Sequence, residues 1–276
     1  MVVTPTEYIA TPSPGRLRYG LFTASEPMPL ARRGGGVAYD LDHCAAGALT
    51  VSQCVASAAK TFEEGGQNEA LPFAVYAGVV CGPVGYSFDE FAAKARAALD
   101  AAEQGAVELA LWTGLDGVGG NALGIDGFNN SSPTVLNPDD EENIKSVISA
   151  LENFAYLTSG YGYEAYIHAP VSVAAYAGTD LIVPDGDLLR TPYGSVWVFG
   201  GGYPGTAAGG SVPAGGTTLY VTGKTNVWRS DDVNIPDPAQ TLDRETNQQY
   251  VLAEREYAAS FDCLLGEAEF TYTGGS

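Results

Sequence analysis

The clearest periodic segment of the chain is a long amphipathic helix. From Ser87 to Trp112 apolar residues recur every three or four positions, which places them on one face of an α-helix. Ser87 is followed three residues later by Glu90, the spacing of a capping box that starts a helix. The predicted buried stripe is Phe91, Ala95, Ala98, Ala102, Ala106 and Leu109, and the predicted wet side carries Lys94, Arg96, Glu103 and Glu108.

A second helix is predicted further along the chain. Asn137 is the expected N-cap, Pro138 suits the first helical position, and the acidic residues 139–142 suit the positive end of the helix dipole. The predicted buried stripe is Ile144, Val147, Ile148, Leu151, Phe154 and Ala155.

Strand-like segments lie on both sides of these helices. Residues 48–60 and 71–81 are predicted to form a long hairpin, with the polar tip FEEGGQNE between them. The second segment is apolar on both faces, so both faces should be covered. The pattern leaves open whether the cover is the chain's own core or a neighbouring molecule.

The second half of the chain alternates in character. Strands are predicted at 163–169, 195–199 and 217–222, with a short apolar helix over 171–178, and a long, half-wet antiparallel strand begins near Gln248. Helices and strands in this order, without an internal repeat, predict an α+β domain with projecting arms.

The first 36 residues differ from the rest. They contain five prolines and four of the thirteen cations, with Glu7 and Glu26 as their acids, so their charge is 4 − 2 = +2. The remaining body then carries −20 − 2 = −22. We expect an extended arm without its own core, lying on an acidic surface of its own or a neighbouring subunit, with a frayed terminus as the alternative.

Composition narrows the class of protein. A length of 276 residues allows one large domain or two small ones, and 45% hydrophobic with 17% charged residues indicates a globular chain. The net charge of −20 disfavours specific binding to nucleic acid, which needs clustered cations.

No run is long and apolar enough for a membrane helix, and no signal peptide is recognised, so a soluble, unexported protein is expected. Four cysteines are too few for a disulfide scaffold and are expected to be reduced and packed.

Candidate chemistry is weak throughout. His43 with Cys44, Cys54 and Cys81 lacks the paired spacing of zinc sites, and His168 is expected to be a core or interface histidine. The segments TGKT (222–225) and GVGGNALG (117–124) miss the spacing of phosphate-binding loops. The acids of NPDDEEN complement a helix dipole rather than chelate calcium. No catalytic, cofactor-binding or metal-binding residue is therefore predicted.

The order of elements resembles the tailed-phage major capsid proteins of the Hong Kong 97 fold, in particular an actinobacteriophage-like one. The segments that carry the resemblance are AAEQGAVELALWTG (101–114), IHAPVSVAAYA (167–177), TPYGSVWVFGGGYPG (191–205) and LYVTGKTNVWRSDDVNIPDPAQTLDRETNQQYVLAEREYAASFD (219–262).

The resemblance implies a division of the chain. By it, residues 1–36 are an N-terminal arm, 37–86 an extended loop formed by a β-hairpin and 87–114 the spine helix of a peripheral domain. Residues 115–223 then form an axial domain around a mixed β-sheet, and 224–276 the peripheral loop and return strands.

It also implies function and partners. A protein of this family is a structural component of the virion, not an enzyme: it self-assembles in the host cytoplasm into pentamers and hexamers of an icosahedral head. The head encloses double-stranded DNA without specific binding, involves no membrane, and can use a separate scaffolding protein, a portal and a decoration protein. A loop cross-link from Lys60 to Asn234 or Asn247, known in some members, is unsupported by any pattern here.

Three alternatives stay open at this stage: an encapsulin-like shell, a phage tail-tube, minor head or decoration protein, and a small-molecule-binding module or enzyme. In the favoured interpretation the hairpin lies on one neighbour and the arm straps another. The residues expected in these assembly contacts are Arg16, Arg18, Arg32, Arg33, Phe62, Glu63, Glu64, Phe73, Tyr76, Arg244, Glu254 and Arg255. Because like-charged subunits repel, moderate salt should promote assembly.

Overall fold

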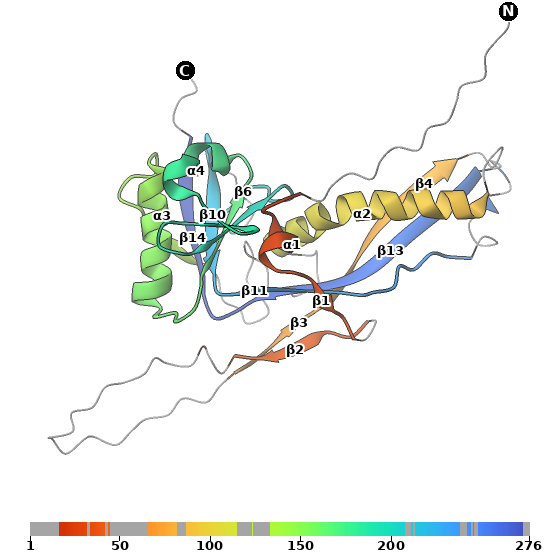
Figure 1. Cartoon of the computed structure of the whole chain (residues 1–276), viewed down its shortest axis with the longest axis horizontal. Helices are drawn as coiled ribbons and strands as arrows, with labels where there is room; N and C mark the ends of the chain where they lie inside the picture. Colours follow the sequence, from red (N-terminus) through yellow and green to blue (C-terminus); the bar gives the residue numbers. More distant parts are fainter. Residues whose placement is uncertain are drawn as a thin grey trace, which may run out of the picture.

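The structure, a computed structural model, places most of the chain in two joined lobes (Figure 1). It describes residues 17–31, 34–41, 44, 66–81, 87–114, 123, 133–207, 211, 213–237, 242–243, 245 and 248–272. The elongated lobe holds the longest helix and the longest strands. The rounder lobe holds a mixed sheet covered by two shorter helices.

The elongated lobe is a helix laid along a sheet. Helix α2 (Phe88–Thr113) runs beside the antiparallel pair β4 (Pro72–Cys81) and β13 (Gln248–Phe261), as Figure 1 shows. Strand β13 also pairs with β11 (Thr225–Arg229) and β12 (Leu242–Asp243), and β1 (Met28–Pro29) pairs in parallel with β11. The register sets Tyr257 opposite Phe73 and Val251 opposite Val79.

The rounder lobe is built on a seven-stranded sheet of order β5-β14-β10-β6-β9-β8-β7. Its strands are β5 (Thr134–Leu136), β6 (Tyr166–Pro170), β7 (Val183–Asp185), β8 (Leu188–Arg190), β9 (Val196–Gly200), β10 (Gly216–Thr222) and β14 (Leu265–Thr271). Helices α3 (Ile144–Glu152) and α4 (Val173–Leu181) accompany it, and a π-helical segment, Asn153–Thr158, continues α3.

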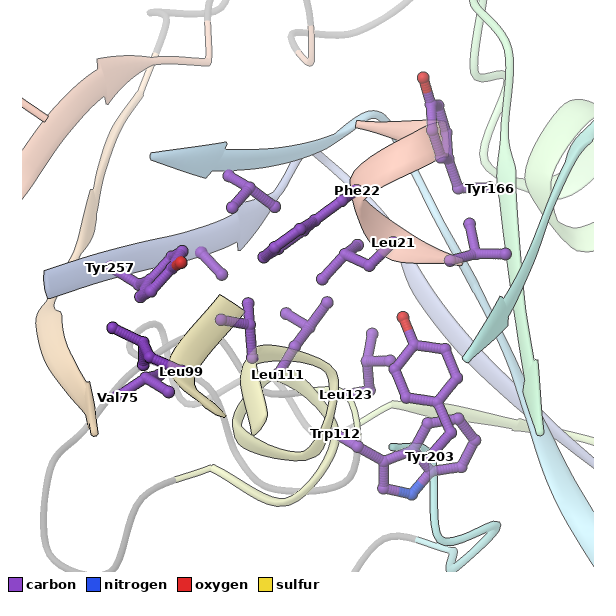
Figure 2. Packing of buried hydrophobic residues seen from close by; sticks show 14 of the residues in the cluster. Leu21, Phe22, Val75, Leu99, Leu111, Trp112, Leu123, Tyr166, Tyr203 and Tyr257 are labelled. Carbon is purple, nitrogen blue, oxygen red and sulfur yellow. The ribbon is translucent and has the colours of Figure 1, made fainter. Parts of the chain in front are cut away.

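The central strands of this sheet are buried on both faces. Ile167, Trp197 and Leu219 join the core under α3 and α4, whereas their neighbours Tyr166, Val198 and Tyr220 join the core under α2. Successive side chains of a strand point to opposite faces, so one sheet serves two cores. Figure 2 shows Trp112 and Tyr203 meeting in the core under α2, and this core links the two lobes.

Two elements lie outside both large sheets. Strands β2 (Val37–Asp40) and β3 (Gln67–Ala70) form a two-stranded antiparallel ribbon beneath the elongated lobe in Figure 1. The backbone N–H of Leu41 donates to the carbonyl of Gly66 at 2.7 Å, which closes the end of the ribbon. The expectation that Gln67, Asn68 and Glu69 belong to a polar hairpin tip is wrong, because these residues pair with β2.

Only the second strand of the predicted hairpin of 48–60 with 71–81 lies within the described residues. Residues 48–60 lie outside the described residues, and the pairing observed for β4 is with β13. The subunit itself covers one face of this apolar strand with α2, whereas Tyr76 on the other face is 70% exposed. Cover of that second face by a neighbouring molecule, the other possibility left open by the sequence, stays a prediction.

The long helix is confirmed, but its buried face differs from the predicted stripe. Ser87 and Glu90 form both hydrogen bonds of a capping box. Leu99, Val107 and Leu111 are buried, whereas Leu109 is 47% exposed. Glu103 and Glu108, expected in water, are 1% and 0% exposed. The buried face of the helix includes both acids because buried groups elsewhere in the chain donate hydrogen bonds to them. The spacing of apolar residues does not reveal these donors.

The second helix begins later than predicted. Its N-cap is Asn143, whose side chain accepts from the N–H of Lys145 at 3.1 Å, and the helix starts at Ile144. Asn137 follows β5, which pairs with β14, and this strand pairing displaces the start. Ile144, Val147, Ile148, Leu151 and Ala155 are buried as expected.

The N-terminal segment is not wholly an arm. Residues 1–16 lie outside the described residues, but Leu21–Ala24 form helix α1, and Leu21 and Phe22 are buried in the core under α2 (Figure 2). The expectation of a segment without a core is wrong for this part, because its two apolar side chains fill space between the lobes.

Two of the four cysteines depart from expectation. Cys44 and Cys263 form a disulfide across 219 residues of sequence, with their Cα atoms 5.2 Å apart. The low cysteine content predicts packed, reduced thiols. That inference fails because pairing depends on proximity in the fold, and the two positions meet only when β2 lies against the end of β13.

Candidate assembly surfaces

The long helix is bound to the sheet by a buried carboxylate. Glu103 accepts a hydrogen bond from the hydroxyl of Tyr257 at 2.5 Å and pairs with the guanidinium groups of Arg255 and, at 3.5 Å, Arg229. Burial is the largest influence on the Tyr257 hydroxyl, and together with Glu103 it raises the pKa of that group well above its usual value. The network fixes the register of α2 on β13.

A second buried carboxylate joins three parts of the chain. Glu108 accepts the backbone N–H of Leu21 at 3.0 Å and that of Gly202 at 2.9 Å, and the amide of Gln104 donates to it at 2.9 Å. Gly202 is required by the close approach, since a Cβ there would lie 2.0 Å from the carbonyl oxygen of Gly105. Glu108 therefore holds the N-terminal segment and the rounder lobe against α2.

His168 belongs to the core, as predicted. Its ring nitrogens bond the hydroxyls of Tyr203 and Thr222, each at 2.9 Å, and the side chain is 0% exposed. Burial lowers the pKa of the imidazole from 6.5 to about 3, so the ring is neutral at physiological pH. These hydrogen bonds satisfy the polar atoms of a buried side chain, which is a structural role.

One face of the elongated lobe is apolar and open. On β4 and β13, the side chains that point away from α2 include Tyr76, Val80 and Tyr250, which are 70%, 53% and 43% exposed. Val80 and Tyr250 lie directly opposite each other in the register, and Tyr76 lies opposite Glu254. We call the set of Tyr76, Val80, Tyr250 and Glu254 the outer face.

The edge beside the outer face is also open among the described residues. There, β4 pairs with β13 and with no other strand. The strand, PFAVYAGVVC, is ten residues long and has no charged side chain. Natural sheets usually protect such an edge with charge, bulges or a covering segment. A long uncharged edge next to exposed aromatic residues is typical of a surface that another chain covers.

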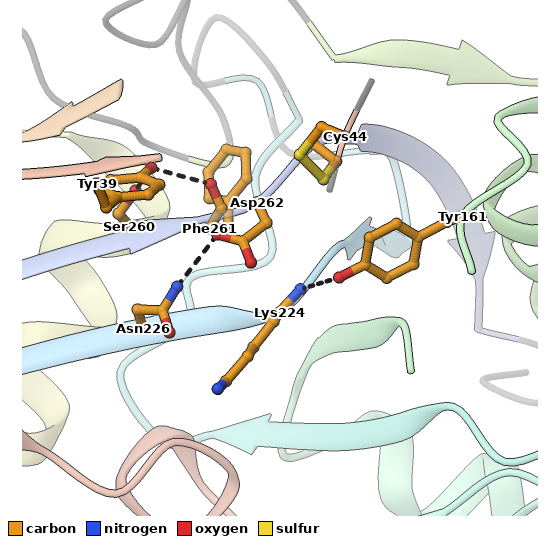
Figure 3. The surroundings of a disulfide bond; sticks show 9 residues. Tyr39, Cys44, Tyr161, Lys224, Asn226, Ser260, Phe261 and Asp262 are labelled. Carbon is orange, nitrogen blue, oxygen red and sulfur yellow. Dashed lines mark hydrogen bonds between the residues drawn. A yellow bond between two sulfur atoms is a disulfide. The ribbon is translucent and has the colours of Figure 1, made fainter. Parts of the chain in front are cut away.

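A broad groove is lined by residues of both lobes and of β2. Figure 3 labels Tyr39, Tyr161 and Asp262 from its lining. The volume of the groove is about 1560 Å³, and its aromatic lining is Tyr39, Tyr156, Tyr161, Tyr163, Tyr166, Tyr193 and Trp228. Ligand pockets usually measure roughly 300–1,000 Å³, so the groove is larger than a small-molecule site. It has the dimensions of a surface that receives a segment of protein.

Several charged side chains that line the groove form ion pairs or hydrogen bonds with other residues of the same chain. Arg190 bonds Asp185 at 2.6 Å and Glu164 at 3.0 Å, and Asp262 accepts from the amide of Asn226 at 3.1 Å. The N–H of Lys224 donates to the hydroxyl of Tyr161, whose pKa burial raises to about 12. The groove is therefore a structured polar and aromatic surface rather than a cluster of reactive groups.

The structure separates the twelve residues expected in assembly contacts. Tyr76 and Glu254 are brought together on the outer face, and Arg18 is exposed just before α1. Phe73 and Arg255 instead face α2, where Phe73 stacks on Tyr257 at 6.1 Å and Arg255 pairs with Glu103. The following lie outside the described residues: Arg16, Arg32, Arg33, Phe62, Glu63, Glu64 and Arg244.

No sequence pattern predicts several of the residues that line the groove. Tyr39, Trp228 and Asp262 line the groove from three separate segments, and only the fold brings them together. The tyrosine count of 16 is a signal that could have pointed to aromatic surface, but not to its place.

The described residues also bear on metal sites and membrane helices. No group of three or more histidine, cysteine or acidic residues there is arranged to hold a metal ion. No helix among those residues is both long and apolar enough to span a membrane.

Comparison with known proteins gives structural likeness without sequence likeness. No family model matches the chain, and no curated protein sequence matches it. Among solved structures, the "capsid of empty GTA particle computed with C5 symmetry" aligns over 98% of this chain and 95% of its own, with 11% identity and a TM-score of 0.58. A chain of Mycobacterium phage Adephagia aligns over 95% and 93%, with 10% identity and a TM-score of 0.54. A chain of Microbacterium phage Oxtober96 aligns over 98% and 96%, with 12% identity and the same score of 0.54.

The fold class follows from these alignments. The chain has a phage capsid fold, with helices and mixed sheets in the same overall arrangement over nearly the whole length of both proteins. It is the Hong Kong 97-like fold that the order of elements in the sequence resembled.

Proposed function

We propose that this chain is the major capsid protein of a tailed double-stranded DNA bacteriophage, building an icosahedral head from pentamers and hexamers. The observation that carries the proposal is an apolar outer face and strand edge left open on a subunit with a capsid fold. An isolated subunit would expose this surface to water, whereas a shell would bury it against a neighbour.

The proposed role is structural, and its chemistry is self-association. The polar and basic part of the predicted arm (1–36) and residues 48–60 of the predicted hairpin are proposed to lie on neighbouring subunits, with Arg16, Arg18, Arg32 and Arg33 against acidic surface. The groove is proposed to receive part of an adjacent copy. Each such contact should bury at least about 1,000 Å².

The proposal places the protein in the virion, assembled in the host cytoplasm around DNA. A body of −22 charge attracts DNA little, which suits a container wall that the genome slides along. A scaffolding protein, a portal and a decoration protein are proposed partners. The GTA capsid with the similar fold was computed with C5 symmetry, and fivefold symmetry is what pentamers give a shell.

The test is to express the full chain and examine purified particles by negative-stain electron microscopy. Closed icosahedral shells of uniform size, with both pentamers and hexamers after image averaging, are the expected result. A chain that stays monomeric at concentrations where capsid proteins assemble, with or without a co-expressed scaffold, contradicts the proposal. Tubes or rings indicate a tail protein, and shells that retain a cargo enzyme indicate an encapsulin-like container.

A further inference from the structure

The disulfide joins two elements that lie far apart in the sequence. Cys44 lies three residues after Leu41, where the β2·β3 ribbon ends. Cys263 lies at the corner between β13, which ends at Phe261, and β14, which begins at Leu265. The bond therefore connects the ribbon to the junction of the two large sheets (Figure 3).

Other contacts between the described residues of the ribbon and the body are made by Tyr39. The hydroxyl of Tyr39 bonds Ser260 and, at 3.2 Å, the carbonyl of Phe261, and its ring packs against Trp228 at 5.9 Å. Among the described residues, β2 and β3 pair only with each other. A two-stranded ribbon by itself is marginally stable in water, so its orientation depends on these attachments.

The backbone at Cys263 gives a second, independent sign that the sulfur matters. Its φ is 59°, in the left-handed region where residues other than glycine are disfavoured. The chain has 35 glycines and uses them at many of its tight corners, yet this corner carries a cysteine. Non-glycine residues persist at such positions where the surroundings or a function require their side chain.

We propose that Cys44 and Cys263 are a redox lock, left as thiols while the shell is built and oxidised in the finished particle, which then fixes the β2·β3 ribbon on the body. This timing rests on the proposed function. Cytosolic thiols are kept reduced, whereas disulfides persist outside the cell. The ribbon is thus free to adjust during assembly and is fixed afterwards. Because β2 also carries Tyr39 and Asp40 into the groove, oxidation fixes one wall of that surface.

The oxidant is a small-molecule disulfide such as oxidised glutathione. Cys263 is the more exposed of the two, so its thiolate attacks one sulfur of the oxidant, forms a mixed disulfide and releases one free thiol. The thiolate of Cys44 then attacks the Cys263 sulfur, forms the Cys44–Cys263 bond and expels the second free thiol. Two protein thiols lose two electrons and two protons, and the oxidant gains both as two thiols.

The test uses the full chain with Cys54→Ser and Cys81→Ser, so that only two thiols remain. Subunits purified with reductant should show two thiols per chain by maleimide labelling, and none after treatment with oxidised glutathione. The product should stay a single chain on a non-reducing gel. Hydrogen exchange of the β2 and β3 amides should slow at least several-fold on oxidation and recover with reductant. Two thiols that persist, or cross-links between chains, overturn the lock.

A matched variant separates the effect of the disulfide bond from the effect of the left-handed backbone at position 263. Cys263→Gly removes the thiol and relieves the left-handed conformation, so it should fold and show the fast exchange of the reduced protein under all conditions. Exchange in this variant as slow as in the oxidised parent shows that the bond adds nothing and overturns the lock.

The formation of shells and their resistance to denaturant are measured in the same samples. Reduced subunits should form shells and oxidised subunits should form fewer, while oxidation after assembly should raise the denaturant concentration needed to open the shell. Equal resistance of reduced and oxidised shells overturns the lock while leaving the proposed function intact. If neither sample forms shells, the proposed function fails, and the thiol and exchange measurements on the subunit still decide whether the bond forms and holds the ribbon.

Discussion

The carboxylate of Glu108 accepts the backbone N–H of Leu21 at 3.0 Å, across 87 residues of sequence. The same group accepts from Gly202 and Gln104, so it connects the N-terminal segment, the long helix and the rounder lobe. Glu108→Ala leaves these buried donors without an acceptor, and we expect the free energy of unfolding to fall by about 3 kcal/mol. Glu108→Gln keeps one acceptor oxygen and should lose about 1 kcal/mol. Urea denaturation of both variants checks this, and equal losses would contradict the role of the carboxylate.

Glu103 and Arg255 should be energetically coupled. Removing either partner leaves a largely buried charge, so Glu103→Leu and Arg255→Met, each alone, are expected to destabilise the fold by about 3–5 kcal/mol. The double variant Glu103→Leu/Arg255→Met replaces both charges with apolar groups and should lose less than the sum of the two single losses. A double-mutant cycle from chemical denaturation measures the difference, with an expected coupling of about 1–3 kcal/mol. Additive losses would show that the pair contributes nothing together.

Stability should fall in mild acid because of His168. Its folded pKa is about 3 and its unfolded value is 6.5, so between these pH values the unfolded chain binds an extra proton. The contribution of neutral His168 is complete above pH 6.5 and is lost as the pH falls through this window. At a pH of about 5 the free energy of unfolding should be about 2 kcal/mol lower than at about pH 7.

The control for this pH dependence is His168→Gln, which does not titrate. It is expected to start less stable, because it repacks the contacts with Tyr203 and Thr222, but to lose less over the same fall in pH. An unchanged slope in this variant would assign the acid sensitivity to a group other than His168.

The outer face should matter for assembly and little for folding. Tyr76 is 70% exposed, so Tyr76→Lys should change the free energy of unfolding by no more than about 0.5 kcal/mol. A charge placed on an apolar contact surface should prevent shell formation, while Tyr76→Phe should preserve it. Thermal denaturation and sizing chromatography of the two variants give the two readouts. Normal shells from Tyr76→Lys would remove this face from the assembly contacts.

Assembly should be faster in moderate salt than in low salt. The net charge of −20 makes subunits repel one another, and about 0.1 M salt screens exposed charges more than about 10 Å apart. Light scattering after mixing purified subunits into buffers of different ionic strength measures the rate. Faster assembly at low salt would indicate that attraction between opposite charges, for example of the N-terminal arginines with acidic surface, outweighs the overall repulsion.

The local elements of the fold could be predicted because their signals are short in range. The capping box of Ser87 and Glu90 and the 14-residue strand β13 are both present as expected. His168, expected in the core or at an interface, is buried in the core. Each depends on residues within a few positions of one another or on the period of a single element.

Which side chains are buried and which are exposed could not be predicted in the same way. Periodicity places acids on the wet side of a helix, but Glu103 and Glu108 are buried because donors from distant segments reach them. Asn137 and Asn143 are both suitable N-caps, and pairing of β5 with β14 decided between them. Arg255 was assigned to an outer contact because a strand pattern shows which residues share a face, but not which face α2 covers.

By itself, the sequence determined the class of fold, the long helix, the main strands and the excess of negative charge, since these follow from local preferences and composition. Tertiary structure alone decided that one sheet serves two cores, that the outer face of β4 and β13 stays open, and that Cys44 meets Cys263. The physical reason is that burial, pairing and proximity are properties of segments far apart in the chain, and no local pattern records which of them will meet.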